Sequence, residues 1–414
     1  MSIPGTLVPL SASLALLLGA CGSGAEDGEG STETNNIGAG ILAAGDPLGG
    51  LTPEQIAAFE VGREDFAEIE EADEGLGPVM NNTGCGVCHD NPATGGSSAA
   101  GLTEVRFGFT GPDGSFDPLA ELGGSLQQLQ GIGEVEEVPG CEGVVFNAEV
   151  VPPEANTVGG RLTTPLFGLG LVDAVPDDEL RALAAAEAII APDTAGRVSE
   201  VTNITTGQPD VGRFGWKAQV ATLADFSGDA YLNEMGITNP LFPSESCPQG
   251  NCDALACDPT PDPEDDGTAL NNFTTFTTLL APLPTLPVKG QAVVGAGVFA
   301  AIGCADCHTP ALVTGSSADP VFDGVTFHPF SDFLLHDMGS LGDQIVQGGT
   351  GAGEMRTAPL WGARVRTSFL HDGRASNLTD AILAHAGQGQ GAADDFADLD
   401  GFLQDALIVF LNTL

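Results

Sequence analysis

Basic residues are scarce in this chain of 414 residues: Lys and Arg together number 12, against 57 Asp and Glu. The formal net charge is −45. A nucleic-acid-binding role is therefore excluded, because it depends on neutralising phosphates with basic side chains. Lysine itself is nearly absent, with Lys217 and Lys289 as its only two positions.

The N-terminal segment lacks charge and is too short to span a bilayer. It is apolar from Leu7 to Leu18, which suits the apolar region of a signal peptide. The next letters, LGAC at 18–21, resemble a lipobox and would make Cys21 the lipidated first residue, although no Lys or Arg precedes the apolar run. An ordinary signal peptide or a misassigned start remain alternatives. We expect a signal peptide over 1–20, a Gly- and Ser-rich tether over 21–50, and a lipid-anchored protein of the periplasm or cell envelope.

The nine cysteines divide by role. Cys21 is the lipid site, and four others belong to the two motifs described next. The remaining four, an even number in an exported chain, suggest two disulfides in one of three pairings, with free thiols as the alternative. These four are Cys141, Cys247, Cys252 and Cys257.

Two C-x-x-C-H motifs carry the chemistry, CGVCH at 85–89 and CADCH at 304–308. Two thiols at this spacing can each form a thioether to a haem vinyl group, while the adjacent histidine binds the iron. One such motif could arise by chance or be a redox dithiol, but two in an exported chain favour two covalently bound c-type haems. The predicted haem-binding residues are Cys85, Cys88, His89, Cys304, Cys307 and His308.

Each motif follows a segment with helical spacing. Thr52 precedes a Pro and an acidic residue, which is typical of a helix start, and Ile56, Phe59, Phe66 and Ile69 share one face. Before the second motif, 288–302 places Val293, Val294, Val298, Phe299 and Ile302 on one face among small residues that would permit close packing. The last apolar series predicts one amphipathic helix that closes the second domain. It comprises Phe396, Leu399, Phe402, Leu403, Ala406, Leu407, Phe410 and Leu411.

The four remaining histidines, His328, His336, His371 and His385, all lie in the C-terminal half. The first haem therefore has no nearby histidine for its sixth position, and an open position is what a small oxidant needs. Met80 or Met235 could instead fill it, or His336 could reach across from the other half.

Arginine and tryptophan offer further candidates. Arg356, Arg364, Arg366 and Arg374 lie close together and suit haem propionates, with surface ion pairs as the alternative. Trp216 and Trp361 could lie on an electron path between the haems, or could be packed core rings.

Several segments in the same order are similar to the bacterial di-haem oxidoreductases, also described as thiol oxidoreductases. They are GLGPVMN at 75–81, FGLGL at 167–171, GRFGWK at 212–217, the stretch 235–243, FSDFLLHDMG at 330–339, RTAPLWG at 356–362 and LHDGRA at 370–375. The resemblance covers about residue 52 to the C-terminus. It extends to di-haem cytochrome c peroxidases and to the di-haem enzymes that mature a tryptophan-derived quinone cofactor.

The resemblance implies a ligand set. In those relatives the distal ligand of the electron-transfer haem follows the His-Asp-Gly stretch by fourteen residues, which here leads from His371 to His385. His308 and His385 would then be the axial pair of the second haem, with His336 and His371 in supporting positions. Calcium between the domains is doubtful, because positions near Arg366 and Ser368 lack the usual Thr and Pro. Glu234 is the candidate for the distal catalytic carboxylate.

The sequence thus predicts a mainly α chain of two cytochrome c-like haem domains, 51–285 and 286–414, the first with a large irregular insertion over about 95–285. We expect a peroxidase-like oxidoreductase in which the open first haem reacts with hydrogen peroxide. The second haem would receive electrons from an external donor, a small cytochrome or a quinol-linked protein. A plain electron-transfer cytochrome and an oxidase of a protein or organic substrate are the alternatives.

Overall fold

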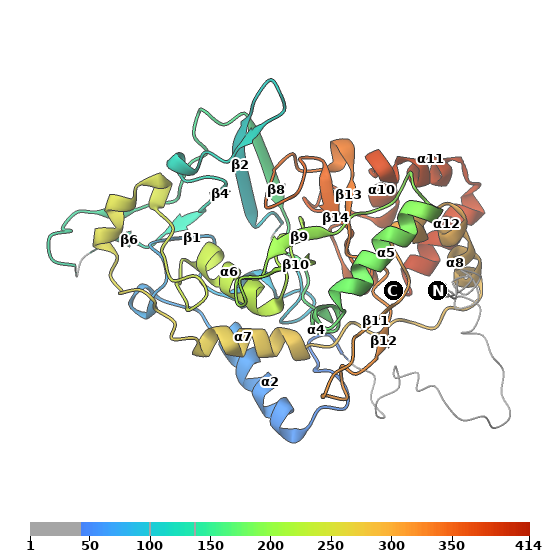
Figure 1. The fold of residues 1–414 in the computed structure, drawn as a ribbon, viewed down its shortest axis with the longest axis horizontal. Helices are drawn as coiled ribbons and strands as arrows, with labels where there is room; N and C mark the ends of the chain where they lie inside the picture. The colour runs from blue at the N-terminus through green and yellow to red at the C-terminus, as the bar shows by residue number, and fades with distance from the viewer. Residues whose placement is uncertain (1–42, 99–100, 136–137) are drawn as a thin grey trace, which may run out of the picture.

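The computed structural model describes residues 43–98, 101–135 and 138–414 (Figure 1). The predicted signal peptide, Cys21 and most of the predicted tether lie outside the described residues. In Figure 1, α8, α10, α11 and α12 gather at the right of the view, and α6 and α7 lie nearer its centre. None of the helices in the described ranges combines the length and apolarity that crossing a membrane requires.

The first helical group packs around the first motif. Thr52 is the N-cap of α2 (Pro53–Phe66), as the sequence predicts, and it forms a capping box with Gln55 that was not predicted. Phe59 and Phe66 are buried against α7, as predicted. Ile56 is 43% and Ile69 53% exposed, so these two residues do not belong to the buried face as predicted. The other helices of this group are α3 (Cys85–Cys88), α4 (Leu169–Asp173), α6 (Leu223–Met235) and α7 (Thr268–Leu279). The helix α5 (Asp177–Ile190) belongs to the same half of the chain but lies toward the second group in Figure 1.

Short antiparallel strands connect these helices. The central strand β2 (Glu104–Thr110) pairs with β8 (Thr157–Arg161), β4 (Leu126–Gln127) and β3 (Phe116–Asp117), with Val105 opposite Gly160. The other pairs in this part are β1 (Val79–Met80) with β5 (Gln130–Gly131), β6 (Gly133–Glu134) with β7 (Val145–Phe146), and β9 (Ser199–Thr202) with β10 (Pro209–Gly212). The predicted irregular insertion thus contains α4 to α7 as well as short strands.

The second helical group surrounds the second motif. It comprises α8 (Gln291–Ala301), α9 (Cys304–Cys307), α10 (Leu378–Leu383), α11 (Gln390–Asp398) and α12 (Gly401–Leu411), with the strand pairs β11 (Leu312–Val313) and β12 (Thr326–Phe327), and β13 (Leu335–Asp337) and β14 (Glu354–Arg356). Close packing at small residues is confirmed at Gly295 of α8, where an added Cβ would lie 1.9 Å from the carbonyl oxygen of Ala406. Val293 and Val294, however, are each 39% exposed.

The predicted single C-terminal helix is two helices. Leu399 ends α11 in an extended conformation, and the Asp400 side chain caps α12 by accepting from the Leu403 amide. Ala406, Leu407, Phe410 and Leu411 are buried as expected, but the break turns Phe402 outward, and it is 59% exposed.

Two hydrophobic cores accompany the two groups. The first draws most of its residues from 59–283 but also contains Phe327, Phe333 and Trp361, and the second lies within 292–414. More residues lie in helices than in strands, but strands and loops together make up a large part of the structure. The predicted class, mainly α, therefore describes the fold only in part. The two predicted disulfides are confirmed, and they pair Cys141 with Cys257 and Cys247 with Cys252.

Candidate functional site

The first C-x-x-C-H motif opens into a cavity of about 140 Å³. Its two thiols lie on α3, and His89 follows the helix with its ring 5.7 Å from that of Phe66 on α2. His89 Nδ1 lies 2.9 Å from the Gly96 carbonyl oxygen, so Nδ1 is the protonated nitrogen and Nε2 is free. Burial lowers the pKa of His89 to about 4, which keeps the imidazole neutral, as metal ligation requires.

Glu234, at the end of α6, lines this first cavity. Its Oε2 accepts from Asn81 Nδ2 at 2.7 Å, and its backbone carbonyl accepts from the Asn81 and Asn82 amides. Burial, together with the nearby Glu104 carboxylate, raises the pKa of Glu234 to about 7. A carboxyl with this pKa can hold or release a proton at neutral pH.

Further charged residues in the first cavity were missed by sequence reasoning. Glu104, Arg106 and Arg161 come from β2 and β8, and Asp229 lies one turn before Glu234 on α6. Burial raises the pKa of Asp229 to about 6. No motif marks these residues, because they come from two paired strands and a helix that meet only in the fold. Tyr231, the single tyrosine of the chain, also lines this cavity.

Of the two candidate methionines, Met235 lines the first cavity, with its Sδ 3.7 Å from Cys85 Sγ. Met80 is buried but is not among the lining residues. His89 is the only histidine among the described residues that line this cavity. His336 lies at the second motif and therefore does not reach across.

The second motif opens into a larger cavity of about 490 Å³. His308 and His385 both line it, with ring centroids 6.5 Å apart. His308 Nδ1 lies 3.0 Å from the Phe330 carbonyl oxygen and His385 Nδ1 2.8 Å from that of Ala381. Each ring therefore keeps a free Nε2. Burial lowers the pKa of both, that of His308 to about 4.

The arginine cluster divides between two environments. Arg356 and Arg366 line the second cavity, where burial lowers the pKa of each to about 10. Neither forms a direct ion pair among the described residues, although the Asp332 carboxylate acts on Arg356 at longer range. Arg366 Nε is buried without a hydrogen-bond partner among them. Arg364 instead donates to the Leu414 carbonyl, and Arg374 pairs with Asp372 at 2.6 Å.

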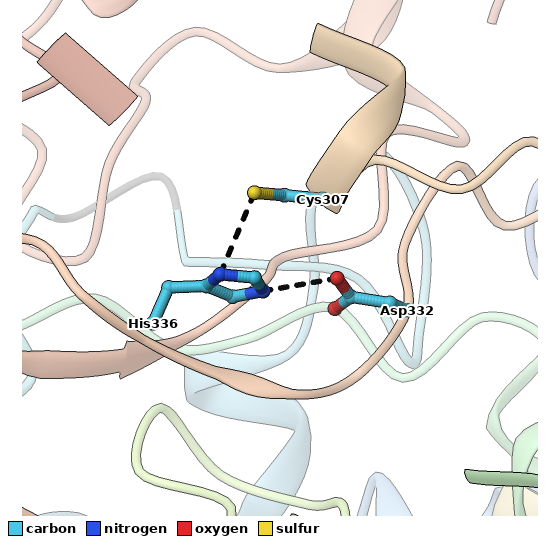
Figure 2. Close-up of side chains that lie close together, drawn as sticks. All are labelled: Cys307, Asp332 and His336. Atoms are coloured by element: carbon cyan, nitrogen blue, oxygen red, sulfur yellow. Dashed lines mark hydrogen bonds and ion pairs between the residues drawn. The ribbon is translucent and has the colours of Figure 1, made fainter. Parts of the chain in front are cut away.

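His336 and His371 also line the second cavity. Figure 2 shows His336 between Cys307 and Asp332, with Nδ1 3.5 Å from Cys307 Sγ and Nε2 2.9 Å from Asp332 Oδ2. The loop after α5 closes over this cluster: Arg197 exchanges backbone hydrogen bonds with Leu335, and Gln388 donates to the Ala195 carbonyl.

The two tryptophans differ in position. Trp216 lines both cavities and donates from Nε1 to the Leu162 carbonyl at 2.8 Å. His371 packs edge-on against its ring at 6.3 Å. Trp361 belongs to the first core, 6.0 Å from Phe327, and lines neither of the two large cavities. Only Trp216 is therefore placed between the two sites.

A small cavity of about 20 Å³ beside Trp216 is lined by Arg213, Arg356 and Arg366 and, among the described residues, by no carboxylate. Four carboxylates do converge within the insertion, with ligand atoms within 4.8 Å of one another: Glu245, Asp258, Asp262 and Glu264. Burial and the neighbouring Glu264 carboxylate raise the pKa of Glu245 to about 9.

The residues present fit haem groups. Two thiols and a neutral imidazole with a free Nε2 line each cavity, as thioether attachment and iron ligation require. In the second cavity the spacing of His308 and His385 leaves room for one metal ion, given metal–nitrogen bonds of about 2.0 Å. The unpartnered Arg366 Nε offers a donor to a carboxylate such as a propionate.

Comparison with solved structures finds distant likenesses. Hydrazine synthase of Kuenenia stuttgartiensis, pressurized with 20 bar xenon, is 15% identical with a TM-score of 0.40, and the match covers 94% of this chain and 100% of that one. A MauG-like protein associated with microbial copper homeostasis is 13% identical with a TM-score of 0.38, covering 90% and 93%. No curated protein matches the chain.

The family comparison is decisive. The model described as "Di-haem oxidoreductase, putative peroxidase" matches residues 150–414, more than half of the chain. The resemblance inferred from the sequence motifs is thereby confirmed, and haem is the cofactor that the family implies. The chain belongs to the di-haem oxidoreductase family.

Proposed function

We propose that the chain is a c-type di-haem peroxidase that reduces hydrogen peroxide at the first cavity with electrons received through the second. The observation that carries this proposal is the asymmetry of the cavities. The second presents a facing pair of histidines, whereas the first presents His89 alone and a buried carboxyl of raised pKa. The four motif thiols would attach one haem in each cavity.

Bound haem supplies electron transfer and, where an axial position is open, reaction with peroxide. Hydrogen peroxide takes up two electrons and two protons and leaves as two waters. Glu234 is the group we assign to move protons, because its side chain lines the first cavity and its pKa of about 7 suits both uptake and release. Asn81 orients its carboxyl through the 2.7 Å hydrogen bond.

In the second cavity, His308 and His385 would hold the iron, with each ring oriented by a backbone carbonyl. Arg356 and Arg366 would bind the propionates. Trp216, in the wall of both cavities, places an aromatic ring between the two sites.

The remaining assignments complete the proposal. Residues 51–285 and 286–414 would form two cytochrome c-like domains, each with one haem. The chain would be exported, lipidated at Cys21 and held at the cell envelope, with a small cytochrome or a quinol-linked protein as external electron donor.

One contact favours a second function. Met235 Sδ lies 3.7 Å from Cys85 Sγ, so a thioether is close to the first attachment site. If Met235 fills the sixth position of the first haem, the protein would be an electron-transfer cytochrome without catalysis. The peroxidase is favoured because Glu234 lines the same cavity. Oxidation of a protein or organic substrate would use the same open site.

Low-temperature electron paramagnetic resonance of the oxidised holoprotein tests this proposal directly. We expect one high-spin and one low-spin haem, with the high-spin signal lost on addition of peroxide. Two low-spin signals that do not change with peroxide would identify an electron carrier instead.

A further inference from the structure

His336 and Asp332 form an ion pair buried beside the second motif. His336 is 2% and Asp332 0% exposed, and Nε2 lies 2.9 Å from Oδ2. The other ring nitrogen, Nδ1, lies 2.9 Å from the Thr194 carbonyl oxygen and 3.5 Å from Cys307 Sγ. Figure 2 shows the ring between the sulfur and the carboxylate.

The partners of the ring determine its charge. A backbone carbonyl can only accept, and an ionised carboxylate can only accept, so both ring nitrogens must carry a proton. Asp332 is itself held as an acceptor, because Oδ1 takes the Leu334 amide at 2.8 Å. The ring is therefore an imidazolium. Although burial opposes it, hydrogen bonds with Asp332 and Cys307 raise the pKa of His336 to about 11.

The imidazolium would persist after haem attachment. A thioether at Cys307 would remove the thiol's contribution but would leave the Thr194 carbonyl and the Asp332 carboxylate in place. Gly196 packs closely against the ring, since a Cβ added there would lie 2.7 Å from Nε2.

The other charges around His336 are few. Glu187 on α5 is buried near the pair, and burial together with Asp332 raises its pKa to about 7. Arg356 on β14 interacts with Asp332 from another side, and neutral His308 and the Asp306 carboxylate come from the motif itself. Asp332 is thus shared by two cations, and removing His336 changes the local charge by one unit.

A buried ion pair is weak evidence for a stabilising role, because apolar residues often replace such pairs without loss. A fixed charge beside a redox group, by contrast, is one of the ways in which a protein sets reduction potential. We propose that His336 is a positioning residue that holds a permanent positive charge beside Cys307, where the second haem would be attached. This charge would raise the reduction potential of that haem. This rests on the proposed function, in which Cys307 carries that haem.

The size of the effect follows from electrostatics. A unit charge within about 12 Å, at an effective dielectric constant of about 20, changes a redox equilibrium by roughly tenfold. For a one-electron couple, a tenfold change is about 59 mV. His336→Gln should therefore lower the potential of the second haem by at least that amount.

Three variants of the full-length holoprotein test this: His336→Gln, Asp332→Asn and the double variant, with His328→Gln as control because His328 lines neither of the two large cavities. Mass spectrometry counts the attached haems, and potentiometric titration gives each potential. We expect two haems in every variant and a lower second potential in His336→Gln. In Asp332→Asn and in the double variant the second potential should stay close to wild type, because losing the carboxylate that holds the imidazolium removes both charges of the pair.

An unchanged second potential in His336→Gln with both haems attached would overturn this inference and leave the proposed function intact. A wild-type protein without two haems would overturn the proposed function itself. If the variants fail to fold, deuterium exchange at histidine C2 in the wild-type protein decides. His336 should show no titration between pH 5 and 9, and a midpoint near 6.5 would refute a permanent imidazolium.

Discussion

The two cavities use similar attachment motifs in different surroundings. The first is small, and charged side chains from β2, β8 and α6 line it beside one histidine. The second is more than three times larger by volume, about 490 against 140 Å³, and is lined by two facing histidines, two buried arginines and many apolar residues. On the proposed function, the motif would specify attachment, whereas the surrounding chain would determine whether the site suits proton chemistry or electron storage.

The largest effect should come from removing one attachment site. Cys304→Ser with Cys307→Ser should abolish the second haem and leave the first, so the protein mass should fall by one haem. The matched pair Cys85→Ser and Cys88→Ser should remove the other. Cys247→Ser with Cys252→Ser, which breaks a disulfide remote from both motifs, should retain two haems. Loss of both haems in either motif variant would show that the sites are not independent.

Glu234→Gln should lower peroxide turnover by roughly 10²–10⁴-fold, because it removes the buried proton carrier of the first cavity. Both haems should remain attached, and the potential of the second should not change. Stopped-flow peroxide assays measure the rate. Glu245→Gln is the control, since Glu245 also has a raised pKa but lines neither haem cavity. Equal loss in both variants would contradict a specific role for Glu234.

His385→Ala should convert the second haem from low spin to high spin without detaching it, which would make the two cavities alike. Optical and electron paramagnetic resonance spectra report the change, and His328→Ala should leave them unaltered. A low-spin second haem in His385→Ala would remove His385 as a ligand.

The smallest effect concerns stability. The folded-state pKa values of Glu187 and Glu234 are raised to about 7 and that of Glu245 to about 9, above the unfolded value of about 4.3. At these three groups the folded chain binds more protons than the unfolded chain. His89 and His308, whose pKa values are lowered to about 4, act in the opposite direction only below about pH 6.5, so the free energy of unfolding should fall as pH rises from about 6.5 to 9. Thermal midpoints across this range should decrease, and Glu234→Gln should flatten the slope near pH 7. A midpoint that rises with pH would contradict these assignments.

Structural features that depend on a few neighbouring residues could be predicted from the sequence. The helix start at Thr52 and the close-packed Gly295 are set by local capping and by side-chain size. The pairing of Cys141 with Cys257 was not predictable, because it joins positions 116 residues apart through tertiary packing alone. Cysteine count gives the number of bridges but not their partners.

The buried faces of helices, and the positions where helices end, were predicted less well. Val298 and Phe299 are buried on α8 as predicted, but Val293 and Val294 are not. The rest of the buried face is formed by the smaller Ala292, Gly295 and Ala296, and Gly295 allows α12 to approach. The Asp400 cap that divides the C-terminal helix lies within an apolar series that reads as continuous. In the acidic wall of the first cavity, Glu234 was a sequence candidate, but Glu104 had no sequence signal because it meets Glu234 only in the fold.

The loop after α5 has a consequence for how the protein can be made. Thr194, Ala195 and Arg197 supply backbone contacts to His336, Gln388 and Leu335, so part of the second site is contributed by the first half of the chain. A C-terminal fragment starting at residue 286 would leave His336 Nδ1 without its carbonyl acceptor and β13 with an open edge. The two halves are thus one biosynthetic unit, and during translation the covering loop emerges before the motif that it covers.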